Sequence, residues 1–180
     1  MRKQQREAIL ALLEETYMGT ETALNYSTPF ELLVAVIMSA QCTDERVNKI
    51  TARIFPKYNT PEKMGALSQE QLEEEIRDCG LFRSKAKNLL ATCKMLTEEY
   101  NSVIPDTVEE LMKLPGVGKK TANVVASIVY KVPAIAVDTH VFRVSHRLGL
   151  AKGDDPLAVE KELQKAIPKN KWSDAHHWLI

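Results

Sequence analysis

The sequence predicts an all-α, two-lobed protein. Apolar residues recur three or four positions apart through almost every segment, as they do on one face of a helix. Serine, threonine or aspartate precedes several of these segments, where helix N-caps are expected. No alternation of apolar and polar residues is long enough for a convincing strand. With 180 residues, 44% of them hydrophobic, the chain can bury a substantial core.

The first half of the chain predicts one core helix and several capped helices. Thr28 is the predicted N-cap of the core helix, Pro29 takes its first position, and Glu31 stands where a capping box needs it. This helix runs to about Ser39 and is apolar on nearly every side, so we expect it to be buried. The other helices expected here are residues 3–16, a helix capped by Thr43, a turn opened by Thr60-Pro61, residues 68–79 and residues 84–100.

The second half predicts shorter helices around a glycine turn. Thr107 and Glu110 predict a capping box for a helix that ends at Lys113. Residues 134–137 are apolar but few, and we expect a buried connector there. The remaining predicted helices are residues 119–130, 139–148, 156–167 and one opened by Ser173.

The glycine turn in residues 114–122 is the most informative stretch. Two glycines two positions apart allow a backbone that approaches a ligand closely, and a helix with two lysines at its start follows. Residues 108–130 therefore predict a helix–hairpin–helix unit that holds a nucleic-acid phosphate through backbone N–H groups. A close helix–helix connection that needs small residues is the alternative. The residues predicted to contact DNA here are Gly116, Val117, Gly118 and Lys119.

A lysine at this helix start could act as a nucleophile. A neighbouring cation, the helix N-terminus and partial burial all favour the neutral amine, which can attack a sugar C1′ and form a Schiff base. Lys119 and Lys120 lie about 100° apart around a helix, so only one can face a given pocket. Residue types alone favour two exposed lysines that contact phosphates, and spacing does not choose between them.

Asp138 stands between the apolar connector and a helix. This position is usual for an N-cap, and the residues alone favour that role. The same carboxylate could also serve as a general base or stabilise a developing sugar cation. Gln41 lies in a polar junction between two helices and could reach into a duplex. The four histidines lack metal-ligand spacing, so we expect them to be structural.

Charge and cysteine content limit the partners. Because 24 basic residues balance 24 acidic ones, any DNA contact must come from a local patch. The acidic residues of 70–78 predict a solvated helix face, whereas basic residues in 83–87 and around the glycine turn are candidate patches. The cysteines are three and widely spaced, which predicts reduced thiols in an intracellular protein: Cys42, Cys79 and Cys93. No apolar run predicts a signal peptide or a membrane span.

Taken together, these residues resemble the endonuclease III family, DNA glycosylases of the helix–hairpin–helix superfamily. The resemblance covers essentially the whole chain, with several motifs in the family's order. The motifs are Leu33 to Asp44 around Ser39-Ala40-Gln41, Gly80-Leu81 with Ser84-Lys85-Ala86, Leu114 to Val125, Val137 to His140 with Phe142-Arg143-Val144, and His176 to Leu179.

The resemblance implies roles that the residues alone leave open. It implies that Lys120 is the nucleophile, and that Asp138 assists expulsion of the base and deprotonation of Lys120. It also implies that Gln41 and Leu81 enter the gap left by an extruded nucleotide. The residues implied or expected near the lesion pocket are Ser39 and His140.

The implied activity is removal of oxidised pyrimidines from damaged duplex DNA, followed by β-elimination. An adenine glycosylase of the same superfamily, which typically lacks the lysine, and a non-catalytic DNA-binding hairpin module are the alternatives. We expect a helical barrel at 22–132 and a second lobe from 1–21 with 133–180, and Lys120 facing Asp138 across the cleft. We also expect a cytoplasmic monomer, associated with the nucleoid if bacterial.

Family members usually carry four cysteines that ligate a [4Fe–4S] cluster. The three cysteines here lack that spacing, so we expect no cofactor in these residues and a cluster only in a longer form. The apolar ending Trp178-Leu179-Ile180, inside an apparent helix, predicts that C-terminal sequence is missing.

Overall fold

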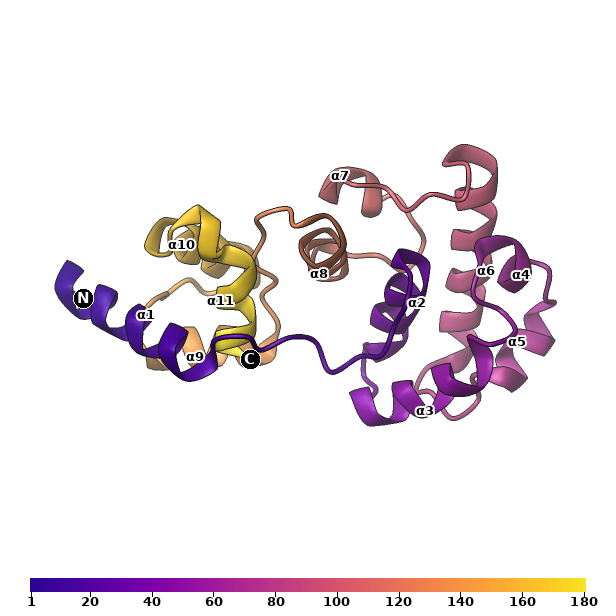
Figure 1. Ribbon diagram of the computed structural model, residues 1–180, viewed down its shortest axis with the longest axis horizontal. Coiled ribbons are helices and arrows are strands. Elements are labelled where there is room, and N and C mark those ends of the chain that lie inside the picture. The colour runs from indigo at the N-terminus through magenta and orange to yellow at the C-terminus, as the bar shows by residue number, and fades with distance from the viewer. The chain divides into compact units, whose positions relative to one another are not determined.

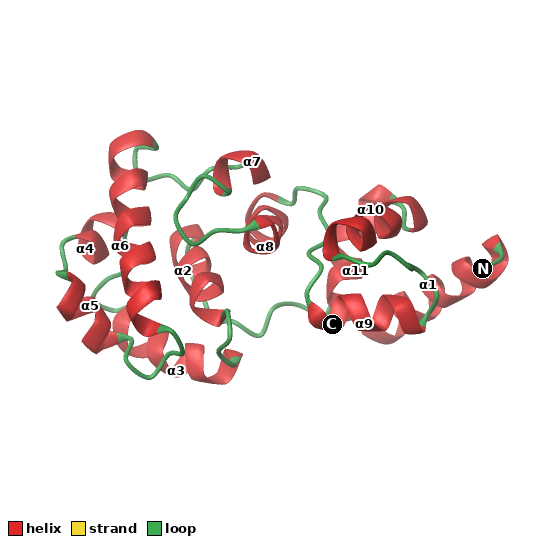
Figure 2. Ribbon diagram, turned by 180° about the vertical axis from the view of Figure 1, so that it is seen from behind, coloured by secondary structure: helices red, strands yellow, loops and turns green.

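The computed structural model describes residues 1–180, and every regular element in it is a helix (Figures 1 and 2), which confirms the all-α prediction. The chain divides into two compact units. We call residues 23–125 the hairpin unit, and residues 1–22 together with 126–180 the terminal unit. None of the helices combines the length and the apolar character that a transmembrane span requires.

The hairpin unit is built around α2 (Pro29–Ser39). Residues 30–38 of this helix are all buried, which confirms the predicted core helix. The long helix α6 (Phe82–Glu99) packs against α2, and Figure 2 shows α4 and α5 beside it. The other helices are α3 (Asp44–Ile54), α4 (Pro61–Gly65), α5 (Gln69–Glu75), α7 (Val108–Leu111) and the start of α8 (Lys119–Tyr130).

Helix starts follow the sequence closely, but two predicted capping boxes are wrong in their second bond. Each predicted threonine accepts its backbone N–H, whereas the glutamate three positions later binds elsewhere. Glu31 accepts from the Ser27 N–H at 2.6 Å. Glu110 accepts from the Tyr100 hydroxyl at 2.7 Å and from the Lys113 ammonium at 2.5 Å. The N-caps confirmed in this unit are Thr28, Thr43, Thr60, Ser68 and Thr107.

The terminal unit packs its helices around a second core. α11 packs against α1 and α9, and α10 packs against α9. The connector at 134–137 is buried and contains no strand, as predicted. The elements are α1 (Lys3–Tyr17), α9 (Thr139–Arg147), α10 (Pro156–Ala166), the 3-10 turn η1 (Lys169–Lys171) and α11 (Trp172–Leu179).

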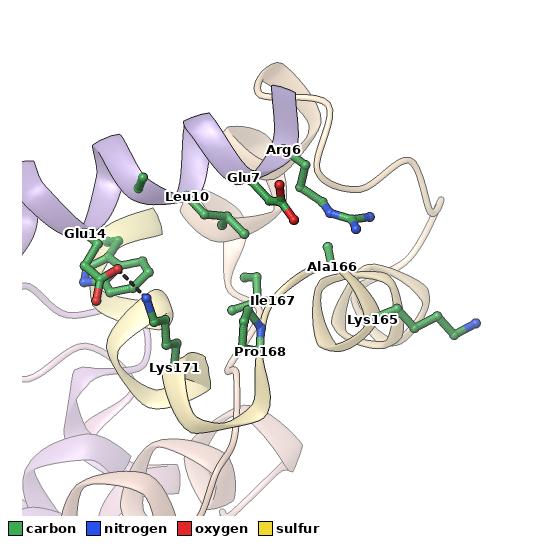
Figure 3. A pocket seen from close by; sticks show the side chains of 11 residues that line it. Arg6, Glu7, Leu10, Glu14, Lys165, Ala166, Ile167, Pro168 and Lys171 are labelled. Carbon is green, nitrogen blue, oxygen red and sulfur yellow. Dashed lines mark hydrogen bonds and ion pairs between the residues drawn. The ribbon is translucent and has the colours of Figure 1, made fainter. Parts of the chain in front are cut away.

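A groove of about 380 Å³ lies in the terminal unit between α1 and residues 165–171. Figure 3 shows that Leu10 and Ile167 line it, while Glu14 and Lys171 form an ion pair with a 2.5 Å separation. None of the predicted site residues lines this groove.

Burial of α2 yields a stability prediction. Leu32 is 0% exposed, so Leu32→Ala should lower the free energy of unfolding by about 2–5 kcal/mol, through lost apolar burial and a cavity. Leu12 is 63% exposed, and Leu12→Ala should change it by less than about 0.5 kcal/mol. Urea unfolding followed by circular dichroism measures both, and equal effects would contradict the assignment of α2 to the core.

Candidate functional site

The predicted phosphate-binding turn is a tight hairpin between α7 and α8. Leu114 and Val117 are buried, and the Val117 N–H donates to the Leu114 carbonyl at 3.1 Å. Gly116 has φ +79°, which L side chains rarely adopt, and a Cβ there would lie 3.0 Å from the Asn88 side chain. Gly118 is exposed, with open space where a Cβ would stand. The turn therefore requires one glycine for its own geometry, whereas the other leaves room beside the backbone.

Helix α6 anchors this hairpin at two points. The buried Thr92 hydroxyl donates to the Pro115 carbonyl at 2.8 Å. The Tyr100 hydroxyl bonds Glu110, and this bond raises the pKa of Tyr100 to about 12. The Lys113 ammonium, and then Tyr100, lowers the pKa of Glu110. Helix α7 and the start of the turn are thus fixed to one rigid element.

The start of α8 is unusually basic. The Ala122 N–H donates to the Gly118 carbonyl at 2.9 Å, and no acidic side chain lies in the first turn, where Lys119 and Lys120 stand. Cations are unfavourable at the positive end of a helix dipole, so an anion bound here would stabilise this end of the helix. Both lysines are exposed. The partial burial expected for the nucleophilic lysine is therefore wrong.

Gln41 and Leu81 share an uncommon backbone conformation. Both are exposed and left-handed, with φ values of 53° and 58°, and Leu81 is 58% exposed. α5 ends at Glu75, before the predicted Cys79, because residues 76–80 form turns that lead to Leu81. A non-glycine residue at positive φ persists only where its surroundings hold it, and such residues cluster at functional sites.

Asp138 is the N-cap of α9, as the residues alone favoured. Its Oδ1 accepts from the Val141 N–H at 2.8 Å, and the residue is half-buried. The connector before it is fixed by the buried His176, whose Nδ1 donates to the Ala136 carbonyl at 2.9 Å. The carboxylate therefore has a defined position at a helix start.

Ser39 and His140 lie in different units, and their lesion-pocket roles stay predictions. The half-buried Ser39 hydroxyl donates to the Val36 carbonyl at 2.7 Å. Exposed His140 accepts at Nδ1 from the Arg143 guanidinium at 3.3 Å. No group of three or more histidine, cysteine or acidic side chains is placed to hold a metal ion.

Lys85, predicted to belong to a basic surface patch, is buried and only 5% exposed. Its Nζ donates to the Met38 carbonyl at 2.8 Å, to the Ala40 carbonyl at 2.5 Å and to the Cys79 sulfur at 3.2 Å. The Cys79 thiol also donates to the Met38 carbonyl, at 3.3 Å. A sequence signal for this burial exists, because Lys85 stands four residues before Leu89 on the apolar face of α6.

The residues present do not fit a [4Fe–4S] cluster, which needs four cysteine thiolates. Cys93 is buried, and burial raises the pKa of its thiol to about 12. Burial also raises the pKa of Cys79, whose sulfur bonds Lys85. Cys42 is half-buried, and the chain contains three cysteines in all.

Comparison with known proteins gives one consistent result. Residues 34–169 match the family model of the HhH-GPD superfamily of base excision DNA repair proteins. Endonuclease III of Bacillus subtilis (strain 168) is 50% identical over 177 residues, which cover 98% of this chain and 81% of that protein.

Two solved structures match equally well. A trapped endonuclease III–DNA covalent intermediate, in an estranged-adenine complex, has a TM-score of 0.96 and 52% identity; the match covers 100% of this chain and 85% of that one. A non-covalent endonuclease III–DNA complex has a TM-score of 0.95 and 52% identity, with coverages of 99% and 84%.

The two hairpin glycines should differ in their effect on stability. Gly116→Ala should lower the free energy of unfolding by about 1–3 kcal/mol, because of its positive φ and the nearby Asn88. Gly118→Ala should leave it unchanged or raise it by up to about 1 kcal/mol, since its surroundings are open. Urea titration of both variants checks this order, and the reverse order would contradict the hairpin geometry.

Proposed function

Because the chain belongs to the endonuclease III family of the HhH-GPD superfamily, we propose that it is a bifunctional DNA glycosylase and AP lyase. Its substrate is damaged duplex DNA that contains an oxidised pyrimidine. The observation that carries this proposal is the position of Lys120. This lysine is exposed in the first turn of α8, directly after the two-glycine hairpin. A structurally similar endonuclease III has been trapped as a covalent intermediate with DNA, which supports a nucleophilic mechanism.

The hairpin binds the DNA backbone. Gly116, Val117 and Gly118 supply a backbone that a phosphate can approach, and the helix dipole and Lys119 supply positive charge. Such contacts fix the register of the duplex without reading its bases. A phosphate here also relieves the repulsion between the two lysines and the helix N-terminus.

The damaged nucleotide is extruded before the chemistry, at a cost of a few kcal/mol. Gln41 and Leu81 fill the gap that it leaves; Gln41 is exposed in the turn between α2 and α3, and Leu81 is exposed just before α6. Ser39 and His140 are the candidates for contacts with the extruded base. The protein acts as a monomer in the cytoplasm, on nucleoid DNA if its source is bacterial.

Lys120 then performs the covalent step. Its neutral amine forms a bond with C1′, the C1′–N bond breaks, and the electron pair leaves with the base. One proton passes from the nitrogen to the ring oxygen O4′ as the C1′–O4′ bond breaks, and the nitrogen lone pair forms the iminium between Lys120 and C1′. Removal of a C2′ proton then expels the 3′ phosphate, so β-elimination nicks the strand on the 3′ side.

Asp138 assists both bond changes. Its carboxylate accepts a proton from Lys120 and stabilises the positive charge that develops on the sugar. The N-cap bond to Val141 holds the carboxylate in one orientation and is compatible with this role. Lys120 belongs to the hairpin unit and Asp138 to the terminal unit.

Lys120→Ala should abolish covalent trapping. Incubation with a duplex that contains an oxidised pyrimidine, in the presence of borohydride, should give a protein–DNA adduct with the parent and none with the variant. Lys119→Ala is the matched control and should weaken binding while still forming the adduct. If Lys120→Ala traps as well as the parent, Lys120 is not the nucleophile. If the parent binds an abasic duplex without nicking it, the protein is a non-catalytic module.

Asp138→Asn should slow single-turnover excision by about 100-fold, because the amide cannot accept the proton. Its oxygen can still accept from the Val141 N–H, so thermal stability and DNA affinity should change little. Quench-flow or gel kinetics, with a parallel melting curve, measure both quantities. Unchanged turnover would reduce Asp138 to a helix cap.

A further inference from the structure

We propose that Lys85 is a positioning residue that holds Gln41 and Leu81 in register, so that the two side chains enter DNA together. This inference rests on the proposed function, because it concerns the extrusion of a nucleotide. It is carried by contacts of the buried Lys85 that lie wholly within the hairpin unit.

The Lys85 side chain fixes the loop that carries Gln41. A buried ammonium is costly unless it is hydrogen-bonded, and here its acceptors include the Met38 carbonyl at the end of α2 and the Ala40 carbonyl beside Gln41. The bond to Ala40, at 2.5 Å, is made by the residue directly before the left-handed Gln41. Any movement of this loop must therefore break a charge-assisted bond.

Lys85 also fixes the second loop. Its backbone N–H donates to the Leu81 carbonyl at 3.0 Å, and its ammonium contacts the Cys79 sulfur at 3.2 Å, two residues before Leu81. The same residue therefore bonds both loops, one through its side chain and the other through its side chain and backbone. Loops that share one buried anchor keep a fixed separation.

Close backbone packing reinforces this connection. A Cβ added to Gly80 would lie 2.9 Å from the Gln41 carbonyl oxygen, so the two loops touch beside the exposed side chains. Gln41 and Leu81 both hold a left-handed conformation that costs energy when it is not supported. Lys85 and Gly80 supply that support, so the exposed residues are ready before DNA binds.

Lys85→Met tests the proposal, because methionine keeps much of the apolar stem and removes the donors. Single-turnover excision is measured on two duplexes: one with a base-paired oxidised pyrimidine and one with the same lesion in a small mismatched bubble. Extrusion costs least for an unpaired base. We expect a loss of about 10- to 100-fold on the paired lesion and a much smaller loss on the bubble, since the chemical groups are untouched.

Leu96→Ala is the control for destabilisation alone. Leu96 is 0% exposed on the same helix, about 16 Å along it from Lys85. This variant should lower the melting temperature yet keep the parent's ratio of paired to bubble rates. If Lys85→Met does not fold, Gly80→Ala takes its place, because its Cβ displaces the Gln41 carbonyl and should change the ratio in the same direction.

The outcomes separate the two levels of the proposal. An equal loss on both substrates, or no loss, in a folded variant would overturn the positioning role of Lys85 while the enzyme remains a glycosylase. A parent protein that excises neither lesion would overturn the proposed function and, with it, this inference.

Discussion

The hairpin unit depends on the hydrogen bond that the last carbonyls of α2 receive. The helix is buried along nearly its whole length, so its terminal carbonyls cannot all turn to water. The Lys85 ammonium enters the interior and donates to the Met38 carbonyl. The hydrogen bond between the ammonium and this carbonyl offsets the energetic cost of burying the charge and also gives the helix end a donor. From this one interaction follow the position of the turn after α2 and its contact with the turn before α6.

Helix α6 links this buried interaction to the glycine turn between α7 and α8. Its N-terminal half carries Lys85, its middle places Thr92 under the Pro115 carbonyl, and Tyr100 at its end reaches Glu110. A helix is stiff along its axis, so three features far apart in sequence keep fixed distances. The glycine turn and the loops that carry the exposed Gln41 and Leu81 therefore belong to one rigid frame.

Local signals predicted the fold well because helix caps are formed by residues three apart. The five threonine and serine N-caps of the hairpin unit and Asp138 illustrate this. Glu31, Glu110 and Lys85 were mispredicted because partners outside the local pattern decide where their charges go. Residue types and spacing could not choose between Lys119 and Lys120. The roles of Lys120 and Asp138 came from the family pattern and stay predictions.

The cap formed by Asp138 affects how family members should be compared. A carboxylate that caps the start of a helix stabilises the fold whether or not it takes part in chemistry. Its presence in a homologue is therefore a poor marker of an active enzyme. In the proposed mechanism the exposed amine of Lys120 forms the covalent bond, so that mechanism makes it the better diagnostic for sorting catalysts from inactive paralogues in genome surveys.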